Sequence, residues 1–184
     1  MRSLVLALCT VLALGACSAK SVWAPDDAVA KAVYRHNGPP KLTLLTSFKN
    51  ETGQGAHTSL MINGSQRVIF NPSGSYNHEL TPERHDVLFG ITPQMVDLYT
   101  DYHTREDFKA HVLVQEIIVS REVAEMAIRA VMANGTAPYA QCSLSTSSIL
   151  SGLPGFGTIK QTWLPKKLSQ QFGAISGVTT RTIH

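Results

Sequence analysis

Short apolar runs separated by polar turns are the clearest pattern along the chain. Residues 57–62 and 67–70 form two such runs, and Asn63-Gly64-Ser65-Gln66 joins them. An Asn-Gly pair between apolar runs is the strongest short-range signal of a β-hairpin. Side chains alternate between the two faces of a strand, so His57 and Ser59 lie on the same face of the first strand. Residue content predicts further strands at 41–49, 109–119 and 178–183.

Helices are predicted where apolar residues recur every three or four positions. The best example is 121–132, which follows the N-cap candidate Ser120 and ends at Asn134-Gly135, a typical helix stop. Residues 77–90 are dense in proline, histidine and charge, and we expect a long surface loop there. The order of the elements predicts an α+β fold with an antiparallel sheet packed against helices. Further helices are expected at 28–36, 92–102, 141–150 and 166–172.

The longest apolar run lies at the start of the chain. Residues 4–14 follow a positive Arg2 and are too few to span a bilayer of roughly 30 Å, which is typical of a secretory signal peptide. The run ends in Leu14-Gly15-Ala16-Cys17, which resembles the bacterial lipobox, where the cysteine is acylated and becomes the new N-terminus. An ordinary signal peptide cut after Ala16 is the alternative.

This start predicts the organisation of the whole chain. We expect a lipoprotein signal peptide over 1–16, a lipidated tether over 17–27 and one domain over 28–184. The membrane would hold the protein through the lipid on Cys17, in the bacterial cell envelope and facing the periplasm or the outside.

Composition agrees with one folded domain and argues against several kinds of site. The chain has 184 residues, of which 43% are hydrophobic, as in globular proteins, while the 16% that are charged lie below the average of about 25%. Its net charge is +3 and its longest basic run is Lys166-Lys167, so we expect no nucleic-acid partner. His78, His85, His103 and His111 lack the tight spacing of zinc ligands. No glycine-rich loop precedes a helix, and we expect no cofactor and no metal.

Cys142 is the one thiol expected to be free in the mature domain, because Cys9 would leave with the signal peptide and Cys17 would carry lipid. It opens the predicted helix 141–150. The positive end of the helix dipole favours a thiolate, and the free N–H groups there can bind an oxyanion. A buried and inert cysteine is the alternative.

A nucleophilic thiol requires a base and a group that orients the base. His57 opens a strand whose direction the hairpin fixes, and Asn71 lies just across that hairpin. The alternatives are a surface histidine at a strand end and a turn-forming asparagine before Pro72.

This order of residues resembles that of the circularly permuted papain-like cysteine hydrolases. That group includes permuted relatives of NlpC-type cell-wall peptidases and the lecithin retinol acyltransferase-like enzymes. The resemblance is carried by 55–62, 68–74 and 141–145, and it covers about 53–151 without 77–110.

The resemblance implies a permuted papain-like fold and a role for each residue. Cys142 would be the nucleophile, His57 the base and then the acid, and Asn71 the group that orients the imidazole. Gln141 and Ser145 stand where family members often carry asparagine and an aromatic residue.

Two functions remain open. The first is an envelope-anchored cysteine hydrolase or acyltransferase that acts on an amide or ester bond, such as a peptidoglycan peptide or a lipid acyl bond. The second is a catalytically silent lipoprotein that binds envelope components or protein partners.

The anchor can be tested by Cys17→Ser. We expect the variant to move from the membrane to the soluble fraction, because acyl chains contribute ~0.8 kcal/mol per buried methylene and serine cannot accept them. Cell fractionation and mass spectrometry of the N-terminal peptide measure both effects. A variant that stays membrane-bound without lipid would contradict the lipobox interpretation.

Overall fold

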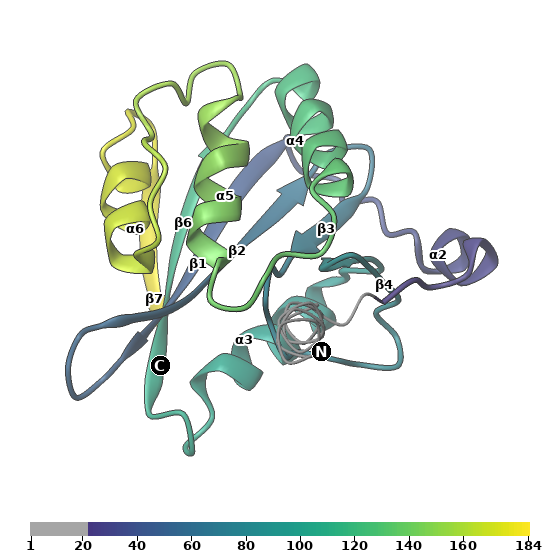
Figure 1. The fold of residues 1–184 in the computed structure, drawn as a ribbon. Coiled ribbons are helices and arrows are strands. Elements are labelled where there is room, and N and C mark those ends of the chain that lie inside the picture. Colours follow the sequence, from purple (N-terminus) through teal and green to yellow (C-terminus); the bar gives the residue numbers. More distant parts are fainter. Residues whose placement is uncertain (1–21) are drawn as a thin grey trace, which may run out of the picture.

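The computed structural model describes residues 22–184, so the predicted signal peptide and Cys17 lie outside the described residues. Its centre is one antiparallel sheet with the strand order β4-β5-β3-β2-β1-β6-β7 (Figure 1). The strands are β1 Lys41–Lys49, β2 Gly55–Asn63, β3 Arg67–Phe70, β4 Glu83–Arg84, β5 Val87–Leu88, β6 Ala110–Ile118 and β7 Thr179–Ile183.

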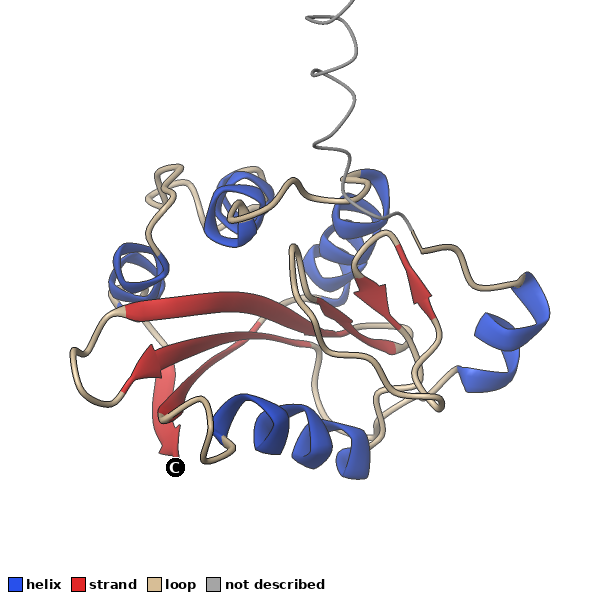
Figure 2. Ribbon diagram, turned by 60° about the horizontal axis from the view of Figure 1, so that its bottom comes forward, coloured by secondary structure: helices blue, strands red, loops and turns tan. Residues whose placement is uncertain are grey.

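Helices cover both faces of this sheet. Figure 2 shows α4, α5 and α6 on one face and α3 on the other, while α2 lies beside the sheet. The predicted α+β class with an antiparallel sheet is therefore confirmed. The helices are α2 Asp26–Ala32, α3 Pro93–Thr104, α4 Arg121–Ala133, α5 Cys142–Ser151 and α6 Pro165–Gly173.

The prediction of a plain surface loop at 77–90 is wrong. This segment contains β4 and β5, and β5 pairs with β3 through Ile69 and Leu88. Val87 and Leu88 are buried. Each of these strands has two residues, which is too few to show the alternation of apolar and polar positions that predicts a strand. The surrounding proline and charged residues instead favoured a loop.

The end of the predicted tether also differs from expectation. Helix α2 begins at Asp26, within the segment expected to be a tether, and ends at Ala32, before the predicted end at residue 36. Trp23 forms a β-bridge with Arg84, and the Ala24 N–H donates to the Glu83 carbonyl over 2.9 Å. The chain from Trp23 onward is therefore fixed to the β4 edge of the sheet.

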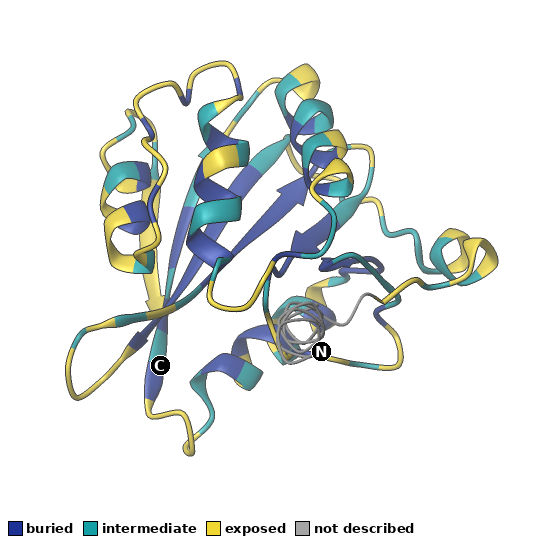
Figure 3. Ribbon diagram, in the orientation of Figure 1, coloured by how far each residue is buried: buried dark blue, intermediate teal, exposed yellow. Residues whose placement is uncertain are grey.

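The apolar core has one layer on each face of the sheet, because side chains alternate along each strand. Figure 3 shows the buried positions concentrated on the strands and on the helix faces turned toward them. Leu42 and Leu44 of β1 pack under α4, α5 and α6, whereas Leu45 packs on the side of α3 with Tyr99.

The site region depends on the unequal length of β2 and β3. These strands pair only from Leu60↔Phe70 to Asn63↔Arg67, whereas β2 continues along β1 back to Gly55. The edge of β2 before Leu60 therefore has no strand partner on its β3 side, and other groups can approach its backbone there.

None of the helices within residues 22–184 has both the length and the apolar character that a membrane span requires.

The core can be tested with two leucine-to-alanine substitutions. Leu44 is fully buried, so Leu44→Ala should lower the free energy of unfolding by about 2–5 kcal/mol through lost burial and a cavity. Leu80 is 58% exposed, so Leu80→Ala should change it by less than about 0.5 kcal/mol. Urea unfolding measures both values. Equal losses in the two variants would contradict the assigned core.

Candidate active site

Cys142 is the first residue of α5, and its side chain is buried, with 6% exposure. Helices α3 and α4 begin with side-chain caps from Thr92 and Ser120, whereas Gln141 provides no such cap for α5. The first N–H groups of a helix have no partner inside the helix and carry its positive dipole end. The uncapped start of α5 can therefore stabilise a negative atom near the sulfur.

His57 and Asn71 are in direct contact. His57 Nε2 lies 2.8 Å from Asn71 Oδ1, the amide oxygen of the residue that follows β3. An amide oxygen can only accept, so Nε2 carries the hydrogen of this bond. In the neutral imidazole the other nitrogen, Nδ1, is then unprotonated and can receive a proton.

The His57 ring and Cys142 come from opposite faces of the sheet. His57 points to the face of α3, while α5 packs on the other face. They meet at the edge of β2 that β3 leaves unpaired: the Ser143 hydroxyl donates to the Thr58 hydroxyl over 3.1 Å, which fixes the start of α5 at this edge.

The surroundings of the thiol favour its charged form. Burial is the largest single effect and raises the pKa of Cys142, but the hydrogen bond and the charge of His57, the Thr58 N–H and the Ser143 hydroxyl together lower it by more. The net result is a pKa below the ordinary value of a thiol. The structure thus brings together the three residues singled out from the sequence.

Asn71 is held on several sides. Its amide oxygen also accepts a hydrogen bond of 2.7 Å from the Tyr99 hydroxyl, and its backbone N–H donates to the Asp86 carbonyl over 2.7 Å. A Cβ atom at Gly74 would collide with the Asn71 amide, so only glycine allows this close approach. The orientation of Asn71 is therefore determined by its surroundings.

Asp86 connects the loop that carries Asn71 with the segment that precedes Cys142. Its Oδ2 accepts the N–H of Ala137 over 2.8 Å and that of Ser73 over 3.3 Å. Burial raises the pKa of the Asp86 carboxyl, while these two N–H groups and the nearby His85 and His57 act in the opposite direction. The Ser73 hydroxyl adds a second connection by donating to the Pro138 carbonyl.

His103 of α3 is a second buried histidine beside His57. The two rings are stacked, with centroids 5.5 Å apart and planes 6° apart. His103 Nδ1 lies 2.8 Å from the Tyr99 carbonyl and donates to it. Burial, followed by the charge of His57, lowers the pKa of His103 to about 4, so this ring is neutral near neutral pH.

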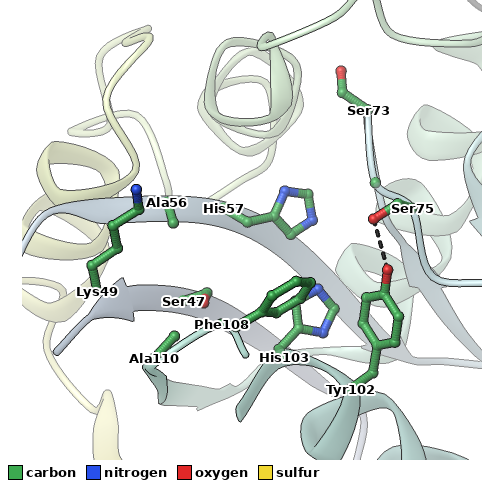
Figure 4. Close-up of a pocket in the computed structure, with 11 residues that line it drawn as sticks. Ser47, Lys49, Ala56, His57, Ser73, Ser75, Tyr102, His103, Phe108 and Ala110 are labelled. Atoms are coloured by element: carbon green, nitrogen blue, oxygen red, sulfur yellow. Dashed lines mark hydrogen bonds between the residues drawn. The ribbon is translucent and has the colours of Figure 1, made fainter. Parts of the chain in front are cut away.

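A cavity of about 250 Å³ opens beside His57 on the α3 side of the sheet. Figure 4 shows the rings of His57, His103, Phe108 and Tyr102 around it, with Lys49 at the far side. Ligand pockets usually hold ~300–1,000 Å³, so this space suits one small group of a substrate. The sulfur of Cys142 does not line the cavity.

Tyr99, Asp86 and the contact of His103 with His57 were not predicted from the sequence. All three residues belong to 77–110, the part of the chain that the family resemblance does not cover. The predicted helix 92–102 contained Tyr99 but ended before His103, so the shared helix face of these two residues was not evident from the sequence; α3 extends to Thr104. Within residues 22–184, no group of histidine, cysteine and acidic side chains has the arrangement of a metal site.

Comparisons of the chain with protein-family models, with curated proteins and with solved structures found no match. The contacts of Cys142, His57 and Asn71 are therefore the basis for any function of this site.

The buried His103 predicts a specific loss of stability in acid. Its pKa is about 4 in the folded protein and 6.5 when exposed, so the unfolded chain binds the proton first and stability falls as the pH drops from 6.5 to about 4. The loss from this group is ~3 kcal/mol at most. His103→Gln should flatten the dependence of the free energy of unfolding on pH in this window, as measured by urea unfolding at several pH values.

The control for this experiment is His184→Gln, which changes an exposed histidine. It should leave the slope as in the parent. If His103→Gln also retains the parent slope, His103 is not the buried neutral ring described above.

Proposed function

We propose that this protein is a cysteine hydrolase or acyltransferase with a permuted papain-like fold, acting on amide or ester bonds. The observation that carries the proposal is the position of His57: its Nε2 is bonded to Asn71, while its interaction with Cys142 lowers the pKa of the thiol. Cys142 is the nucleophile, His57 the base and then the acid, and Asn71 the residue that orients the imidazole.

The reaction follows from these positions. His57 Nδ1 takes the proton of the Cys142 thiol, and the sulfur attacks the carbonyl carbon of the substrate. The N–H groups at the start of α5 stabilise the resulting oxyanion. When the tetrahedral intermediate collapses, the imidazolium gives its proton to the leaving nitrogen or oxygen, and a thioester remains on Cys142. Water or another acyl acceptor, deprotonated by His57, then releases the acyl group and restores the thiol.

The arrangement of the elements also supports this family. The base is on a hairpin strand, the orienting residue directly follows the partner strand, and the nucleophile opens a later helix that packs on β2. This is the order of elements on which the resemblance to permuted papain-like enzymes rests.

We also propose that a lipid on Cys17 holds the domain in the cell envelope. The substrate is then an amide or ester that is reachable from a membrane surface, such as a peptidoglycan peptide or a lipid acyl bond. The cavity beside His57 would receive one small substituent next to the bond that is cleaved.

A catalytically silent binding protein is the second candidate. The observation in its favour is the burial of Cys142, whose side chain is shielded from solvent and does not reach the cavity. The two functions differ in the reactivity of this thiol, which can be measured without knowledge of the substrate.

The decisive measurement is the rate of alkylation of Cys142 by iodoacetamide as a function of pH, followed by mass spectrometry of the Cys142 peptide. For the hydrolase we expect an inflection below the ~8.5 of a free thiol, because His57 stabilises the thiolate. His57→Ala should move the inflection upward, toward ~8.5, since burial is then opposed only by the Thr58 N–H and the Ser143 hydroxyl.

The control is His111→Ala, a histidine that contacts Asn50 rather than the thiol, and it should keep the parent profile. A parent protein with an inflection near 8.5 that His57→Ala leaves unchanged would favour the silent lipoprotein.

A further inference from the structure

We propose that Tyr99 and His103, four residues apart on α3, are positioning residues of the active site. Tyr99 fixes the amide of Asn71, and His103 fixes the plane of the His57 ring. The inference rests on the proposed function and extends it, because it makes α3 part of the site.

Tyr99 determines which end of the Asn71 amide faces His57. Its ring is buried, and burial raises the pKa of its phenol, so the hydroxyl keeps its proton. The Tyr99 hydroxyl donates its proton to Asn71 Oδ1, 2.7 Å away. An oxygen that accepts from Tyr99 must be the carbonyl end of the amide.

This choice of amide end determines the tautomer of His57. The carbonyl oxygen also lies 2.8 Å from His57 Nε2 and can only accept, so the hydrogen is placed on Nε2. Nδ1 is then the basic nitrogen. Without the Tyr99 hydroxyl the amide can turn its NH₂ group to His57, which places the hydrogen on Nδ1 and removes the base.

His103 restrains the same ring on its face. Asn71 holds one edge of the His57 ring, and the stacked His103 ring limits its rotation out of the plane of that bond. His103 is itself fixed by its hydrogen bond to the Tyr99 carbonyl. A neutral aromatic ring also tolerates the imidazolium that forms during catalysis, whereas a second cation would repel it.

The packing of α3 makes these positions rigid. Tyr99 belongs to the core layer with Leu45 and Val112, and its ring contacts Tyr76 in an edge-to-face arrangement at 5.0 Å. The packing of α3 against the sheet therefore fixes the positions of Tyr99 and His103. The titratable and charged groups that face the pair His57 and His103 are Cys142, Asp86, Tyr99, Tyr102, Arg105 and Lys49.

Tyr99→Phe tests the inference with the smallest change, because it removes only the hydroxyl. We expect the alkylation inflection of Cys142 to move upward, part of the way to that of His57→Ala, and the rate at pH 7 to fall by about 3- to 10-fold, as for the loss of one hydrogen bond. Tyr76→Phe is the matched control. It removes a buried hydroxyl of the same core layer that has no hydrogen-bond partner among the described residues, and it should keep the parent profile.

Two further measurements separate positioning from folding. In a Cys142→Ser chain, the ¹⁵N shifts of the His57 ring should report Nε2–H in the parent and a mixture of tautomers with Tyr99→Phe. His103→Phe keeps a stacked ring and should retain most of the rate of Cys142 alkylation at pH 7, whereas His103→Ala should lower this rate. Circular dichroism checks that both variants fold.

The outcomes distinguish this inference from the proposed function. Suppose that Cys142 alkylation in the parent has its inflection below ~8.5, and that Tyr99→Phe has the same pH profile and the same His57 tautomer as Tyr76→Phe. The positioning role is then wrong, while the proposed hydrolase function is not contradicted. If the parent shows no low inflection, the proposed function fails and this inference fails with it.

Discussion

The hydrogen bond between His57 Nε2 and Asn71 Oδ1 is the contact on which the rest of the site depends. It determines which imidazole nitrogen is free to act on the thiol, and it sets the direction of the ring. The bond exists because β3 ends at Phe70 while β2 continues, so that Asn71 leaves the ladder but stays beside the strand of His57. A longer β3 would occupy the edge of β2 that the start of α5 contacts.

Residues from both faces of the sheet contribute to the site. Cys142 lies on the face of α5, and Tyr99 and His103, which contact Asn71 and His57, lie on the face of α3. Asp86 adds a connection at the loops, because one carboxylate binds the N–H groups of Ser73 and Ala137. Three segments that are distant in the sequence are thus kept in register by short polar contacts around one strand edge.

Much of this arrangement could be predicted because it is local or periodic. The Asn63-Gly64 turn fixes the register of the hairpin, and extending the ladder beyond Leu60↔Phe70 places Asn71 opposite Ser59, diagonal to His57 on the same face. Tyr99 and Asp86 could not be found in this way. Tyr99 contacts Asn71, which is 28 residues away in the sequence, and Asp86 contacts Ala137, which is 51 residues away. Contacts between residues so far apart in the sequence depend on how the elements pack, which the periodicity of apolar residues does not reveal. Strands β4 and β5 have two residues each, too few to show an alternation of apolar and polar positions.

With a lipid on Cys17, the attachment of Trp23 to the β4 edge would limit how far the domain can move from a membrane. Trp23 is six positions after Cys17, and six fully extended residues span only about 20 Å. With a lipid on Cys17, the β4 edge would stay within that distance of the bilayer, and the amphipathic ring of Trp23 suits the headgroup region. If the proposed activity is held in this way, it would be confined to the region next to the membrane surface. Its effective substrates would then be selected by their distance from the lipid surface as much as by the shape of the cavity.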